Sequence, residues 1–170
     1  MTDIIQYLLF IFIITAFIWD VKYQRIPNWL TLGGMLFGMV FHLINGAIQG
    51  FLFSVSGLLV GGVICLVLYG LKAVGAGDVK LFFAIGAFVG IEITLYILMY
   101  SIIFGGLIGI VLLVLSRTSL YKVYNRGVGK LNKLFGKSWG LLNKEKKIIT
   151  FPFMYAVLPA IITTYYYTFF

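Results

Sequence analysis

The sequence predicts an all-α, polytopic membrane protein with six transmembrane helices. Three observations lead to this class: the 170-residue chain is 62% hydrophobic, only 11% of its residues are charged, and its mean hydropathy is +1.07. Soluble domains are about 45–50% apolar and about 25% charged. The chain therefore lacks the polar surface that covers a core in water, and a bilayer is the environment that suits it.

Uncharged stretches divide the chain into six predicted helical segments, of which the fourth has only 11 uncharged residues between Lys80 and Glu92, so its ends must lie in polar surroundings or inside the protein. A span needs about 20 mostly apolar residues, and the uncharged stretch 26–71 is long enough for two. The polar, small-residue break at Asn45-Gly46, followed by Gln49-Gly50, separates them. We expect one membrane domain over residues 1–170, with a retained first helix and spans at 4–19, 29–45, 51–71, 79–91, 93–115 and 148–170.

The basic residues predict the orientation of these helices. The chain has 13 Lys and Arg against five acids, and alternation through six spans puts every Lys and Arg on one side. The positive-inside rule identifies that side as the cytoplasm. We therefore expect a protein of the inner (cytoplasmic) membrane with both termini outside.

Most of the basic residues lie in residues 116–147, where apolar and basic positions alternate with helical spacing. This pattern predicts a basic amphipathic helix on the cytoplasmic surface, between the fifth and sixth spans. Anionic membrane lipids are the partner that its charge fits. The net charge of +8 is thus explained by the membrane, and no nucleic-acid partner is expected.

The reactive side chains are few. Cys65 is the only cysteine and His42 the only histidine, so neither a disulfide framework nor a paired-cysteine metal site is expected. We expect no metal and no cofactor, and we interpret His42 as a hydrogen-bonded residue in helix packing.

Two of the five acids have no ordinary surface explanation. Asp3 and Glu92 fall on the predicted outer side, and Glu145 lies among lysines, whereas Asp20 and Asp78 fall at membrane level on the cytoplasmic side. Acids at this depth are costly and are functional candidates by default. Two carboxyls within hydrogen-bonding distance share a proton, and such a pair can activate water against a peptide carbonyl.

The residues around Asp78 support a backbone-lined site. Gly75 and Gly77 permit close approach of another backbone, and Lys80 is near enough to interact with the Asp78 carboxylate. The simpler interpretation is a glycine loop followed by an N-cap aspartate. Pro27 is similarly typical of a helix start.

Two motifs in this sequence resemble those of the type IV prepilin peptidases and their archaeal preflagellin relatives, which are GxGD-type intramembrane aspartic proteases. The first motif is Asp20 followed by Lys22, Arg25 and Ile26-Pro27-Asn28, and the second is Gly75-Ala-Gly77-Asp78-Val-Lys80. The run Phe151-Pro152-Phe153 also resembles the opening of the family's last helix.

This resemblance implies that Asp20 and Asp78 are the catalytic pair. Gly75, Gly77 and Lys80 would support it, and Lys22, Arg25, Pro27 and Asn28 would contact substrate or serve the structure. The implied substrates are prepilin-like precursors, whose short basic leader is removed at the cytoplasmic membrane edge. The chain resembles the short, peptidase-only form, for which no methyltransferase activity is expected; Flp/Tad-type pilin and archaeal preflagellin processing both stay open, as does the oligomeric state.

Two other functions are compatible with the same residues. A small proton- or cation-coupled transporter or channel subunit would use Asp20 and Asp78 to relay protons or bind cations. Such proteins often contain internal repeats, and the two aspartate motifs differ in sequence and helix context. A structural assembly protein gives no reason to bury two acids.

Overall fold

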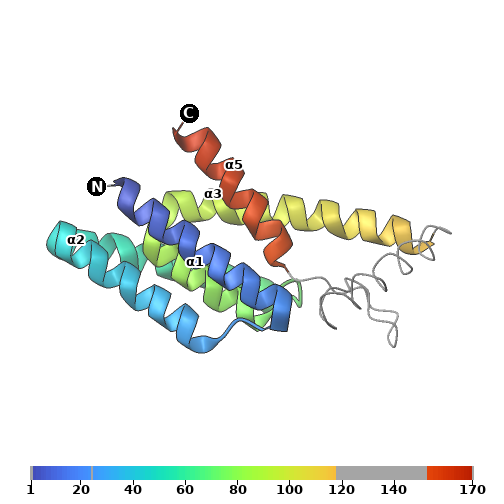
Figure 1. Cartoon of the computed structure of the whole chain (residues 1–170), viewed down its shortest axis with the longest axis horizontal. Helices are drawn as coiled ribbons and strands as arrows, with labels where there is room; N and C mark the ends of the chain where they lie inside the picture. The colour runs from blue at the N-terminus through green and yellow to red at the C-terminus, as the bar shows by residue number, and fades with distance from the viewer. Residues whose placement is uncertain (1, 24, 118–152, 170) are drawn as a thin grey trace.

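The computed structural model describes residues 2–23, 25–117 and 153–169, and the regular elements in these ranges are α-helices (Figure 1). They are α1 (Thr2–Tyr23), α2 (Asn28–Gly70), α3 (Ala76–Arg117) and α5 (Met154–Phe169). The amphipathic helix expected over 116–147 lies outside the described residues, apart from its first two positions, which end α3.

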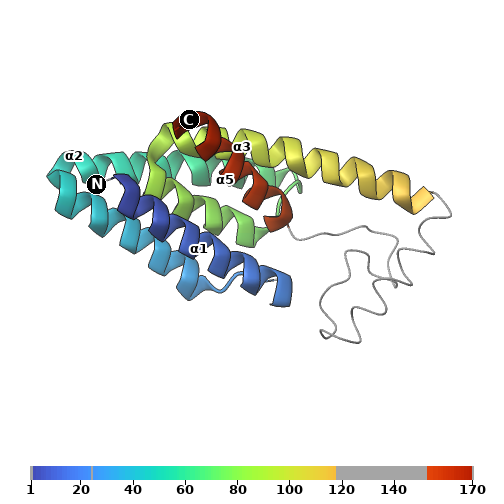
Figure 2. The same ribbon diagram turned by 45° about the horizontal axis from the view of Figure 1, so that its top comes forward.

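The two long helices each fold back on themselves. In α2 the break is at Ala47, with φ 48° and ψ −137°, and in α3 it is at Gly90, with φ 76° and ψ −172°. Figures 1 and 2 show that each helix consists of two arms lying side by side. Glycine adopts such a positive φ readily, whereas in α2 an alanine adopts it although Gly46 precedes it.

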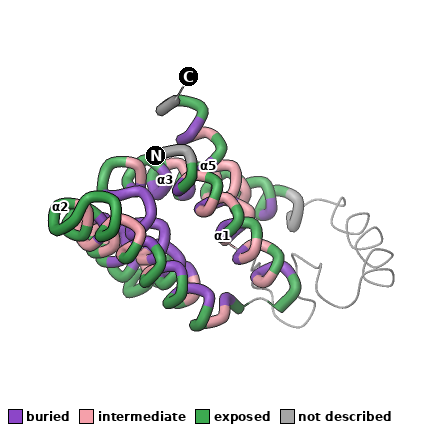
Figure 3. Tube along the Cα trace, turned by 60° about the vertical axis from the view of Figure 1, so that its left-hand side comes forward, coloured by how far each residue is buried: buried purple, intermediate pink, exposed green. Residues whose placement is uncertain are grey.

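Within the described ranges, three helices are long and apolar enough to cross a membrane: Ile4–Tyr23, Asn28–Gly70 and Ala76–Val114. The all-α class is confirmed, and these helices, with the apolar side chains on their outer surfaces, identify a membrane protein. Residues buried in the bundle lie where the helices face one another, and exposed residues lie around them (Figure 3). The number of six spans stays a prediction.

Two expected helix ends were wrong by about a turn. The first helix continues to Tyr23 instead of ending at residue 19, so Asp20 is inside α1. The helix expected from residue 79 begins at Ala76, so Asp78 is inside the first turn of α3. Both errors have one cause: charged residues were used as helix ends, whereas α1 contains Asp20 within its last turn and α3 contains Asp78 within its first turn.

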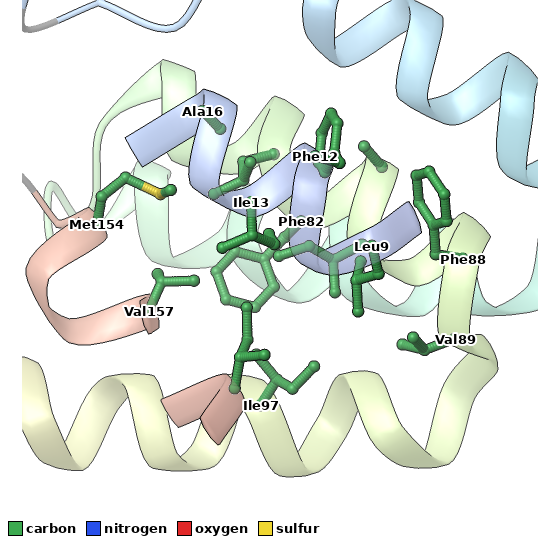
Figure 4. Close-up of a cluster of buried hydrophobic side chains, with 14 of the residues drawn as sticks. Leu9, Phe12, Ile13, Ala16, Phe82, Phe88, Val89, Ile97, Met154 and Val157 are labelled. Carbon is green, nitrogen blue, oxygen red and sulfur yellow. The ribbon is translucent and has the colours of Figure 1, made fainter. Parts of the chain in front are cut away.

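One apolar core holds α1 and α5 against α3. Phe82 is fully buried at its centre, and side chains from α1 and α5 point toward it (Figure 4). Because each buried side chain of this size contributes about 1.5–3 kcal/mol, the core fixes the position of α1 although that helix has little backbone contact with its neighbours. The surrounding residues are Leu9, Ile13 and Ala16 of α1, Ile97 of α3, and Met154 and Val157 of α5.

The arms of α2 and α3 pack through glycines. A Cβ atom added to Gly86 would clash with the carbonyl oxygen of Gly57, and the reverse also holds. The break in α3 frees carbonyls from the helical pattern, and side chains of α2 bind two of them. His42 Nε2 lies 2.9 Å from the Phe88 oxygen, and the Ser54 hydroxyl donates to the Ala87 oxygen at 2.8 Å. The helix-packing role expected for His42 is confirmed.

This packing predicts that Gly86→Ala destabilises the protein by about 1–3 kcal/mol, because the methyl group must push two backbones apart. Gly106→Ala is the matched control in the same helix, since nothing lies within 4 Å of an added Cβ there. Thermal unfolding in detergent micelles measures both changes. Equal midpoints for the two variants would contradict the close contact.

Candidate active site

Asp20 and Asp78 line one cavity of about 320 Å³, at the end of the bundle where α1 ends and α3 begins. The two residues are only 8% and 9% exposed, so neither is an ordinary surface acid. The fold therefore brings the two acids, which belong to different helices and distant sequence motifs, to one place.

Two segments form the rest of the cavity wall: the segment that follows Asp20 in the chain and the segment around Asp78. One segment joins α1 to α2, and the other opens α3. Most of these residues are exposed, so the two buried carboxyls lie at the base of the cavity and a polar rim surrounds them. The lining residues other than the acids are Arg25, Ile26, Asn28, Gly75, Ala76, Gly77 and Lys80.

Asp78 caps the helix to which it belongs. Its Oδ2 atom accepts a hydrogen bond from the backbone N–H of Gly75 at 3.0 Å, while the Gly75 carbonyl accepts from the N–H groups of Asp78 and Val79. Gly75 is thus at the N-cap and Asp78 at the third helical position, which is the reaching-back half of a capping box. Asp78 was expected at the N-cap, and this position was wrong by three residues. Its side chain nevertheless caps the start of α3.

The two glycines before Asp78 have different surroundings and therefore different structural roles. A Cβ at Gly75 would lie 3.2 Å from Asp78 Oδ2, which is a tight contact, whereas a Cβ at Gly77 would meet only Ile26, at an ordinary 3.8 Å. Neither glycine has a positive φ, so what distinguishes them is the absence of a side chain. Gly75 allows the Asp78 carboxyl to approach the backbone, and Gly77 leaves room in the cavity.

A hydrogen bond joins the two sequence motifs at the rim. Lys80 Nζ donates to Asn28 Oδ1 at 2.8 Å, which links the start of α3 to the start of α2. Pro27 is the N-cap of α2, as expected for a helix-start proline. Lys22 lies with its Nζ 5.2 Å from the centre of the Tyr23 ring. Pro27 and Lys22 are not among the residues that line the cavity.

The start of α5 faces Asp20. The Tyr155 ring packs edge-on against the ring of Phe17 in α1, with centroids 5.4 Å apart, and this contact brings the backbone N–H of Met154 near the Asp20 carboxyl. Asp20 Oδ2 is buried and has no hydrogen-bond partner among the described residues. Sequence reasoning did not assign Met154 or Tyr155 to the site; the signal that points to them is Pro152, which marks a helix start shortly before them.

Metal-binding side chains are scattered. Over the ranges that the structure covers, no group of three or more His, Cys, Asp and Glu is arranged to hold a metal ion. Cys65 is a buried free thiol. His42 packs on α3, and it does not line the aspartate cavity.

The fold and the site define a helical membrane protein with two buried carboxyls in one polar cavity. The chain belongs to the type IV leader peptidase family, whose sequence pattern matches residues 7–110. The matched residues include both aspartates and every residue that lines their cavity. The chain is thus a peptidase, and the family indicates prepilin-like substrates. No curated protein and no solved structure matches the chain.

The glycine geometry predicts different outcomes for two alanine variants. Gly75→Ala pushes the Asp78 carboxyl away from its backbone donor and lowers stability by about 1 kcal/mol, the usual worth of such a hydrogen bond. Gly77→Ala leaves that bond intact and changes stability by less than about 0.5 kcal/mol. Thermal unfolding of the two purified variants checks this. A larger loss in Gly77→Ala than in Gly75→Ala would be inconsistent with the capping role of Asp78.

Proposed function

We propose that this protein is a membrane-embedded aspartic endopeptidase that removes the short basic leader from type IV prepilin-like precursors. The observation that carries the proposal is the pair of buried carboxyls in one cavity, contributed by two helices. A single buried acid is explained by helix capping, but two acids lining one cavity are not. Family membership supports peptide hydrolysis over the movement of protons or cations.

In the proposed reaction the two aspartates divide acid and base work. The ionised carboxylate takes a proton from a water molecule, whose oxygen attacks the peptide carbonyl, and the protonated partner donates its proton to the carbonyl oxygen. The tetrahedral intermediate then releases the amine, which leaves with a proton.

The cavity wall fits an extended peptide. Gly75, Ala76 and Gly77 present backbone with little side chain, so a substrate strand can come close to the two carboxyls. Arg25 and Lys80 make the rim positive, which disfavours a path for the basic leader directly over them. We propose that the peptide bond is held over the glycines while the leader extends away from these two cations.

We further propose that the chain spans the membrane six times, through α1, the two arms of α2, the two arms of α3, and α5. The reversals at Ala47 and Gly90 support this arrangement. Lys22, Arg25, Lys72 and Lys80 would then lie with the aspartates at the cytoplasmic edge, as the positive-inside rule requires. Both termini would lie outside.

The proposed chemistry predicts that Asp20→Asn and Asp78→Asn each lower the cleavage rate of a co-purified precursor by about a thousandfold, within the range that acid–base groups contribute. Asn keeps the size of the side chain and removes the acid. The measurement is a timed cleavage assay with sequencing of the new N-terminus.

Asp3→Asn is the matched control, because it makes the same chemical change near the other end of α1. It should cleave at the wild-type rate. Thermal unfolding of all three variants separates lost chemistry from lost structure. Cleavage by folded Asp78→Asn at the wild-type rate would disprove the aspartic mechanism.

A further inference from the structure

A second cavity, of about 360 Å³, lies away from the aspartates. Side chains from the second arm of α3 and from the C-terminal half of α5 form it. This half of α5 lies toward the end of the bundle where α3 turns back (Figures 1 and 2). Its lining residues are Glu92, Tyr96 and Tyr100 of α3, and Thr164 and Tyr167 of α5. The proposed peptidase reaction uses none of them.

The lining side chains have a regular arrangement and a distinct chemistry. Glu92, Tyr96 and Tyr100 follow one another at four-residue intervals, so they share one face of α3. Thr164 is buried and its hydroxyl donates to the Ala160 carbonyl at 2.8 Å. It therefore shapes the cavity but has no free hydrogen-bond donor for a ligand. The cavity therefore offers a ligand one carboxylate, three phenol rings and their hydroxyls.

A carboxylate beside several aromatic rings selects an organic cation. The negative faces of tyrosine rings attract ammonium groups, which is the principle of the aromatic cages that bind choline and methyl-lysine. The Glu92 carboxylate adds direct charge attraction and repels a ligand that carries only negative charge. The phenol hydroxyls are able to donate to phosphate oxygens, so a zwitterion with both groups fits better than a simple amine.

The surroundings of the cavity point to a lipid as the source of this ammonium. Ile91, Leu95 and Met99 flank the Glu92–Tyr96–Tyr100 row on the same arm and are exposed. They form an apolar strip along which acyl chains can lie while the headgroup enters the cavity. We propose that this cavity binds a phospholipid with an ammonium headgroup, of the phosphatidylethanolamine class, at the end of the bundle opposite the aspartates.

The test measures lipid binding to the full-length protein purified in detergent, by native mass spectrometry with short-chain phosphatidylethanolamine and phosphatidylglycerol. The wild type should prefer the ethanolamine lipid. Glu92→Gln and Tyr96→Leu should each weaken its binding by about tenfold, the effect of one charge or cation–π contact. Tyr7→Leu, at an exposed tyrosine outside the cavity, should bind as the wild type does.

Thermal unfolding without added lipid verifies that each variant is folded. Equal binding of the two lipids, or unchanged binding by folded Glu92→Gln, would overturn the proposal and leave the tyrosines as general interfacial anchors. Free phosphoethanolamine that binds as tightly as the lipid would overturn the lipid assignment.

Discussion

The structure depends on the burial of two carboxyl groups at helix ends within an apolar bundle. An ionised carboxylate taken out of water costs several kcal/mol unless hydrogen bonds or favourable dipoles compensate. Both acids lie beside a helix N-terminus, where backbone N–H groups are unpaired and the dipole favours negative charge. Asp20 also belongs to the last turn of α1, whose own dipole disfavours a carboxylate, so it depends on the start of α5. Asp78 accepts from Gly75 at the start of α3, and Asp20 faces Met154 at the start of α5. The two helix starts therefore lower the free-energy cost of burying carboxylates in this cavity.

Three further features of the described helices bring those helix ends together: two chain reversals, a close glycine contact and one apolar core. The reversals at Ala47 and Gly90 return α2 and α3 toward the end where they begin, and the Gly57–Gly86 contact locks their arms at backbone distance. The core around Phe82 then holds α1 and α5 in place (Figure 4). Because α1 is positioned by side chains more than by backbone contact, the location of Asp20 depends on that core.

The sequence predicted the features that depend on sums over many residues, but it did not predict those that depend on a few specific contacts. Hydropathy sums over long stretches, so the helices could be predicted, and charge counting alone put Asp20 and Asp78 on one side. The helix ends could not be predicted, because a charged residue can lie either inside the end of a helix or in the loop beyond it. The positive φ of Ala47 instead of Gly46, the Lys80–Asn28 hydrogen bond and the contact between Met154 and Asp20 each depend on tertiary packing that a one-dimensional pattern does not contain.

The most direct test of the central claim, that Asp20 and Asp78 share one cavity, is cross-linking in intact membranes. In a Cys65→Ala background, cysteines placed at positions 20 and 78 should be joined by a short bismaleimide. Cysteines at positions 20 and 92 should not be joined, because Glu92 lines the cavity at the far end of the bundle. Failure of the 20–78 pair to cross-link, although each cysteine reacts singly, would contradict the account.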